Sequence, residues 1–239
     1  MKTLIPKNDY WLLKYHLALI QWSTGNISTA KQLLEACGNI PDYAPFYAAR
    51  ANFNMTNDSN RALADLQRAA NLDKQQWRYG KNLVNYYLSQ KQYQQALTVA
   101  KEYQIRFPGN YILGMLYVKT LMSNNQYSEA NNLLQTIQIL PNEGATDGRQ
   151  LYKETQLMLA LDEMKKKNYK QALQYIAAAR LWPENLGVGK PYDDDIDERV
   201  EDWLAYENYA RLGNDQAAKQ MLDHILAFKP YRDENGSVY

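Results

Sequence analysis

Residues 91–103 read KQYQQALTVAKEY, and two other stretches of the chain repeat their pattern at intervals of 34 residues. Residues 57–69 read NDSNRALADLQRA, and residues 125–137 read NQYSEANNLLQTI. In each stretch a polar turn precedes an alanine, and an apolar residue or a tyrosine follows four and seven positions later. A fixed period of about 20 to 50 residues is typical of solenoids, in which each unit buries its apolar face against its neighbours.

The alanine recurs outside these three stretches. The full set is Ala30, Ala62, Ala96, Ala130, Ala172 and Ala218, with gaps of 32, 34, 34, 42 and 46 residues. Apolar residues or tyrosine four and seven positions later lie on one face of an α-helix. A proline eleven or twelve positions after five of the alanines marks the end of that helix. The period therefore predicts six units of helix, tight turn and helix.

This pattern resembles the tetratricopeptide repeat, a helix pair of about 34 residues whose second helix begins Gly-Asp-Tyr-x-x-Ala and ends Leu-x-Pro. Residues 77–110 fit best, because they carry Tyr87, the phrase at 91–93, Ala96 and Phe107-Pro108. The second and sixth copies are weaker, with Ser59 and Asp215 at the aromatic position. The resemblance covers nearly the whole chain and implies an all-α, right-handed superhelical solenoid of about six helix-turn-helix repeats.

We predict one domain over residues 1–239 without β-strands. Its expected repeats are 9–42, 43–76, 77–110, 111–144, 151–184 and 196–230, with insertions at 141–149 and 184–197. The expected helices are 9–24, 27–39, 43–55, 59–71, 76–90, 93–106, 110–124, 127–139, 149–167, 169–181, 196–212 and 215–228. The polar segment 231–239 is expected to cap the last helix.

The composition argues against several classes of partner. The chain is 46% apolar and 22% charged, with a net charge of +1, so it lacks the basic footprint of a nucleic-acid binder. Its longest basic run, 165–167, is expected to cap a helix. No apolar run is long enough for a signal peptide or a membrane span. By default we expect a cytoplasmic protein, or a periplasmic or extracellular one if the chain is a fragment.

The sequence offers no catalytic, cofactor or metal constellation. His16 and His224 are the only histidines, and neither has a cysteine or carboxylate at zinc-ligand spacing. The glycines of residues 186–190 lack the spacing of a phosphate loop. The acidic residues of 193–198 are expected to favour a helix N-terminus, with a metal site as the weaker alternative. We predict no enzyme, no cofactor and no metal.

The tetratricopeptide resemblance also implies where a partner binds. In that family the first helices of successive repeats line a concave groove that holds an extended peptide or a helix. On this chain the groove positions are assigned to Tyr15, Trp22, Tyr47, Arg78, Lys81, Asn85 and Lys119. Lys81 and Asn85 match one repeat's share of a clamp for chaperone C-termini, but Leu116 and Glu154 break the rest of it. We expect a protein or peptide partner of another kind.

Two alternatives remain open. The insertions at 141–149 and 184–197 occupy corresponding places in adjacent repeats, so they are expected to project from one edge and contact a partner. Residues 182–192 and 197–203 also resemble the C-terminal helical repeats of certain large bacterial proteins with a β-rich N-terminal part of unknown function. That resemblance implies a structural arm of a carbohydrate-associated protein, packing on a domain of the same polypeptide.

Overall fold

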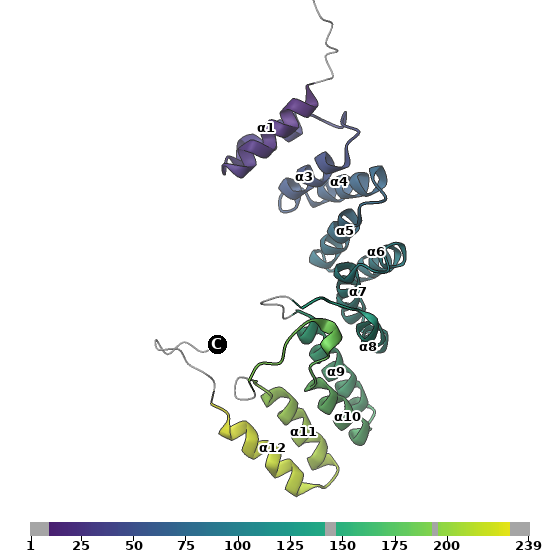
Figure 1. Ribbon diagram of the computed structural model, residues 1–239, viewed down its shortest axis with the longest axis vertical. Helices are drawn as coiled ribbons and strands as arrows, with labels where there is room; N and C mark the ends of the chain where they lie inside the picture. Colours follow the sequence, from purple (N-terminus) through teal and green to yellow (C-terminus); the bar gives the residue numbers. More distant parts are fainter. Residues whose placement is uncertain (1–9, 142–146, 193–195, 230–239) are drawn as a thin grey trace, which may run out of the picture. The chain divides into compact units, whose positions relative to one another are not determined.

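The computed structural model describes residues 10–141, 147–192 and 196–229, and every regular element in these ranges is helical. Figure 1 shows the helices following one another as antiparallel pairs. In chain order they are α1 (Trp11–Ser23), α2 (Ile27–Glu35), α3 (Ala44–Asn54), α4 (Ser59–Leu72), α5 (Trp77–Ser89), α6 (Tyr93–Arg106), α7 (Tyr111–Ser123), α8 (Tyr127–Thr136), α9 (Asp147–Lys165), α10 (Tyr169–Ala179), the short 3-10 helix η1 (Glu184–Leu186), α11 (Arg199–Arg211) and α12 (Asp215–Ala227). The predicted all-α repeat fold is confirmed.

Five of the helix pairs share one turn. Each turn has three residues, and its middle residue has a positive φ: Gly25, Lys91, Asn125, Lys167 and Gly213. The N–H of the third turn residue donates to a carbonyl five residues back, as from Asn26 to Gln21 at 2.8 Å and from Gln92 to Tyr87 at 2.8 Å. The turn before α4 differs. It spans 55–58 without a positive φ, and the Asp58 carboxylate accepts from the Arg61 N–H at 3.0 Å.

The repeat alanines form the contact surface within the pairs. Ala30, Ala62, Ala96, Ala130 and Ala172 are fully buried, and Ala218 nearly so. A methyl side chain lets the partner helix approach closely, which explains why alanine recurs at this position. One predicted helix end is wrong by four residues. The helix expected at 27–39 ends at Glu35 because 36–39 form a turn with Gly38 at φ 59°, and η1 was not anticipated.

The chain divides into two compact units, residues 1–107 and 108–239. The N-terminal unit contains α1 to α6, and the C-terminal unit contains α7 to α12. The prediction of one continuous domain stays a prediction. The expected polar cap at 231–239 lies outside the described residues.

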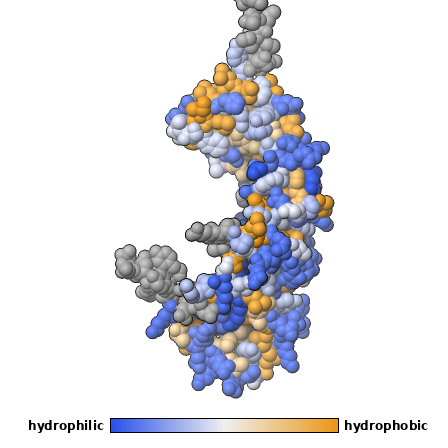
Figure 2. Space-filling view, in the orientation of Figure 1, coloured by the Kyte–Doolittle hydropathy of each residue, from blue (hydrophilic) through white to orange (hydrophobic). Residues whose placement is uncertain are grey.

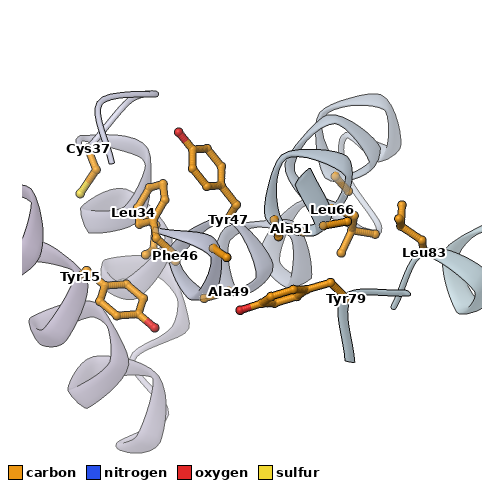
Figure 3. Packing of buried hydrophobic residues seen from close by; sticks show 14 of the residues in the cluster. Tyr15, Leu34, Cys37, Phe46, Tyr47, Ala49, Ala51, Leu66, Tyr79 and Leu83 are labelled. Atoms are coloured by element: carbon orange, nitrogen blue, oxygen red, sulfur yellow. The ribbon is translucent and has the colours of Figure 1, made fainter. Parts of the chain in front are cut away.

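The core of the N-terminal unit combines small and aromatic side chains (Figure 3). Tyr15 on α1 lies edge-on to Phe46 on α3, with ring centroids 6.1 Å apart. Leu66 on α4 and Leu83 on α5 belong to the same cluster. Alanines allow the helices to approach, and the rings fill the wider gaps between pairs.

The C-terminal unit packs its last two pairs around a smaller cluster. Ala160, Ala172, Ile176 and Ala205 are buried there, and Met164 and Met221 pack against them. No helix in the described part of the chain is both long enough and apolar enough to span a membrane.

Candidate functional site

Three of the predicted partner-binding residues share one face of α5. Arg78, Lys81 and Asn85 follow one another at intervals of three and four, so their side chains leave the helix on the same side. Arg78 and Asn85 are exposed, and Lys81 is partly exposed. The Arg78 guanidinium lies 4.7 Å from the centre of the Trp77 ring and donates to the Gln76 side chain at 3.2 Å. This face is therefore basic and open to solvent.

The arginines of the N-terminal unit differ in their partners. Four of them form ion pairs: Arg50 with Asp65, Arg61 with Glu35, Arg68 with Asp42, and Arg106 with Glu102. Within the described residues Arg78 is the one arginine of this unit that pairs with no carboxylate. Its contacts are instead with the Trp77 ring and the Gln76 side chain.

Trp22, on α1 of the same unit, provides an apolar surface. Its side chain is 37% exposed, and the covered part lies against Phe53 of α3 with ring centroids 4.8 Å apart. A tryptophan that is held on one side and open on the other can anchor an apolar group of a partner.

Tyr15 and Tyr47 were expected on an open surface, and that placement is wrong. Tyr15 is 6% exposed and Tyr47 is 2% exposed. The Tyr47 hydroxyl donates to the Pro41 carbonyl at 2.8 Å, because the loop before α3 folds over this side chain. Burial raises the pKa of the Tyr15 phenol. Both residues are part of the packed interior (Figure 3).

Lys119 lies on α7, in the C-terminal unit, and is exposed. Its ammonium is 3.8 Å from the Asp147 carboxylate, which is itself 80% exposed. The seven predicted residues are thus divided between two units and, in the N-terminal one, between surface and core. Trp22, Arg78, Lys81 and Asn85 are the set that one unit presents to solvent.

The C-terminal unit contains a charged network that the sequence did not reveal. Asp202 on α11 is buried, and its two oxygens contact Arg180 Nη2 at 2.7 Å and His224 Nδ1 at 2.5 Å. Arg180 also binds Glu198 at 2.8 Å. The network borders a pocket of about 620 Å³ between the end of α10 and α12. The 22-residue separation of Asp202 from its two partners is the only sequence signal, and it carries no recognisable motif.

A second buried charge lies nearby in the same unit. Glu201 is fully buried, and Lys153 Nζ on α9 is 2.6 Å from its carboxylate. Arg149 donates to the Ala179 carbonyl at 2.7 Å and lies 4.6 Å from the Trp182 ring. Burial lowers the pKa of this guanidinium, which the Glu201 charge opposes. These residues connect α9, α10 and α11, so their role is structural.

The start of the second insertion packs against the rest of the unit instead of projecting, whereas residues 189–192 are exposed and Tyr192 is 85% exposed. Asn185 donates its side-chain amide to the Leu134 and Ile137 carbonyls at 2.9 and 2.8 Å, and Leu186 is buried. Gly187, at φ 69°, packs against Ile139 so closely that an added Cβ would lie 2.9 Å from its carbonyl oxygen. The segment therefore covers the end of α8. In the first insertion, Gly148 and Arg149 are buried in α9, while 142–146 lie outside the described residues.

The acidic run at 193–198 is only partly described, since 193–195 lie outside. Asp197 accepts from the Arg199 N–H at 3.0 Å, which fits the expected role at a helix N-terminus. Glu198 instead pairs with Arg180. Among the described residues no group of three His, Cys, Asp or Glu side chains is placed to hold a metal ion.

Residues 87–142 match the family model of the tetratricopeptide repeat. Together with the helix pairs, this match supports a tetratricopeptide repeat protein. The match runs from the end of α5 through α6, α7 and α8, where the sequence pattern is most regular. No curated protein matches the chain.

Several solved structures share the fold. A tetratricopeptide repeat protein from Parabacteroides merdae ATCC 43184 has a TM-score of 0.56 and 12% identity, over 93% of this chain and 81% of that one. YrrB, described as a TPR protein with an unusual peptide-binding site, has a TM-score of 0.50 and 20% identity, over 79% and 87%. A chain in a structure of Naa15/Naa10 bound to HypK-THB has a TM-score of 0.61 and 12% identity. The alignment covers 93% of this chain and 32% of that one.

Proposed function

We propose that this chain is a non-enzymatic scaffold that binds a protein or peptide segment on the exposed face of its N-terminal unit. The binding residues are Arg78, Lys81 and Asn85 on α5, with Trp22 on α1 as an apolar anchor. The preferred segment is acidic and carries an apolar side chain. The fold that the chain shares with tetratricopeptide repeat proteins, one of them described by its peptide-binding site, supports this proposal.

One observation carries the proposal, namely the unpaired charge of Arg78. Every other arginine of the unit is matched by a carboxylate, whereas Arg78 and its neighbour Lys81 make no ion pair with any described residue. Arginine is enriched in binding hot spots, because its guanidinium forms paired hydrogen bonds with carboxylates. An acidic segment would supply the carboxylate that none of the described residues places there.

The test is a peptide array with two matched sets. One set carries apolar residues among Asp and Glu, and the other has the same sequences with Lys in place of each acid. We expect the chain to retain the acidic set, and retention to fall as salt is added, since exposed charges are screened. Equal retention of both sets contradicts the charge preference, and retention of neither contradicts peptide binding by this face.

A charge reversal with a matched control locates the site. Arg78→Glu/Lys81→Glu should abolish retention of the acidic peptides. Lys101→Glu changes the charge of the same unit at an exposed position on the second helix α6, and it should leave retention intact. Equal loss in both variants would indicate a general effect of net charge instead of a site on α5.

The alternative, a structural arm of a larger bacterial carbohydrate-associated protein, stays a prediction. No feature of the described residues favours it over the scaffold. The hydrogen bonding of Asn185 and the burial of Leu186 account for part of the segment on which that resemblance rests.

A further inference from the structure

The outer face of α1 is apolar and exposed. Leu13, Leu17 and Ile20 are 66, 41 and 57% exposed, and their spacing of four and three places them in one stripe along the helix. Hydrophobic surface gathers on the N-terminal part of the molecule in Figure 2. A soluble protein rarely leaves such a stripe uncovered, because contact with water is unfavourable for each of these side chains.

The repeat geometry shows which positions of the other first helices this stripe corresponds to. The α1–α2 and α5–α6 pairs have first helices of equal length and the same three-residue turn, so each residue of α1 corresponds to the residue 66 positions later. Leu13, Leu17 and Ile20 therefore correspond to Tyr79, Leu83 and Tyr86 of α5, all of which are buried.

The buried face of α5 packs on the preceding pair. α5 contacts α4, and the Tyr86 hydroxyl donates to the Ser59 carbonyl at the start of α4 at 2.9 Å. Leu83 points toward Leu66 of α4 in Figure 3. This face of a first helix is thus the one that receives the second helix of a neighbouring pair.

The C-terminal unit repeats the arrangement with more polar residues. Glu201, Ala205 and Asn208 hold the corresponding positions of α11, and all three are buried where α11 packs against α10. The buried face of α11 is therefore more polar than the exposed face of α1. A neighbouring second helix covers this face of α11, whereas the more apolar face of α1 is exposed in the part of the chain that the structure describes.

The last helix presents the complementary surface. Leu66, Ala69 and Ala70 lie on the buried face of α4, and the corresponding residues of α12, 156 positions later, are Leu222, Ile225 and Leu226. Leu226 is 75% exposed, and the other two are partly exposed. α12 thus offers an apolar second-helix face that the described residues leave partly open.

We propose that α12 of a second copy of this chain packs on α1, so that copies associate head to tail. The contact continues between molecules the stacking that α4 forms with α5 and α10 forms with α11 within one molecule. It joins two different surfaces, so each added copy leaves one surface of each kind open. One helix pair buries less than the standard area of a stable complex, and the association is therefore weak and dependent on concentration.

Sedimentation velocity of the full chain from about 1 µM to about 1 mM tests this proposal. We expect the mean sedimentation coefficient to rise with concentration. Leu13→Glu/Ile20→Glu on α1 and Leu226→Glu on α12 should each remain monomeric throughout. Ile105→Glu, at an exposed site of α6, is the control and should assemble as the parent does. Far-UV circular dichroism checks that each variant keeps its helices, and Ile20→Gln replaces the charged α1 variant if it does not.

Mixing the two monomeric variants identifies the type of contact. The α1 variant retains an intact α12, and the α12 variant retains an intact α1, so the mixture should form a one-to-one dimer and nothing larger. Self-association of Leu226→Glu alone would mean that α1 pairs with α1 and would overturn the head-to-tail contact. A parent chain that stays monomeric at every concentration would overturn the proposal entirely.

Discussion

The two units fix their connecting segments in opposite ways. In the N-terminal unit Arg50 reaches from α3 into the preceding loop, where it donates to the Gly38 carbonyl and to the Asn39 side chain, the latter at 2.8 Å. In the C-terminal unit the segment after α10 supplies its own anchor, because Asn185 donates to two carbonyls at the end of α8. One anchor is a charged group of a helix, and the other is a neutral amide of the segment.

This difference determines what each anchor requires from its surroundings. The Arg50 guanidinium is almost fully buried, so it needs a counter-charge, and Asp65 of α4 supplies one through contacts at 2.8 and 2.6 Å. Asn185 carries no charge and is only partly buried, so its hydrogen bonds alone compensate for the water that it loses. We therefore expect the charged anchor to be much less tolerant of losing a partner.

The largest effect should follow from removing the counter-charge. Asp65→Asn keeps the shape of the side chain but leaves a buried, unpaired guanidinium, so it should lower the free energy of unfolding by about 3–5 kcal/mol. Urea unfolding followed by far-UV circular dichroism measures the loss. The double variant Arg50→Met/Asp65→Leu should recover part of it, because no uncompensated charge remains, although the Gly38 carbonyl and the Asn39 side chain lose their donor. A cost below about 1 kcal/mol for Asp65→Asn would show that water reaches the pair.

A smaller effect is expected from the neutral anchor. Asn185→Ala removes two hydrogen bonds to backbone carbonyls and should cost about 1–3 kcal/mol. Hydrogen exchange at the Ile139 N–H, which donates to the Asn185 carbonyl at 2.8 Å, should accelerate as the segment loosens. Asn132→Ala, at an exposed site of α8, is the matched control and should change neither measurement. Unaltered exchange in Asn185→Ala would show that the burial of Leu186 suffices to hold the segment.

The features that the sequence predicted are those with local causes. The helix pairs follow from apolar spacing along each helix, and the turns follow from glycine or polar phrases between them. At Gly25 and Gly213 a glycine occupies the left-handed turn position. At Lys91 and Lys167 the turn has the same geometry, although a positive φ is unfavourable for lysine. Only the repeat period predicted a turn at these two places.

The features that the sequence did not predict depend on contacts between distant segments. Asn185 bonds to carbonyls 48 and 51 residues earlier in the chain. Tyr47 looked like a surface aromatic until the loop before α3 was seen to cover it. Of the candidate site, the α5 residues and Trp22 are at least partly exposed, and their role in binding stays a prediction. The sequence could not distinguish exposed site residues from buried aromatic residues, because both recur at helical spacing along the first helices of the repeats.

The smallest effect is expected at an exposed pair. Asp197 accepts from Arg199 at 2.9 and 2.6 Å, and this hydrogen bonding holds the pKa of the Asp197 carboxyl below its ordinary value. A pKa that is lower in the folded state adds stability above the unfolded pKa, and that stability is lost as the pH falls through the folded pKa. Arg199→Gln should raise the pKa toward its ordinary value, which NMR titration of the carboxyl carbon measures. Arg211→Gln, at the exposed end of the same helix, should leave the pKa of Asp197 unchanged.

Because Asp197 and Arg199 are both about half exposed, water solvates them when the pair is broken. The loss of unfolding free energy in Arg199→Gln should therefore be far smaller than in Asp65→Asn. An equal loss would mean that charge pairing, and not burial, sets the cost in both units.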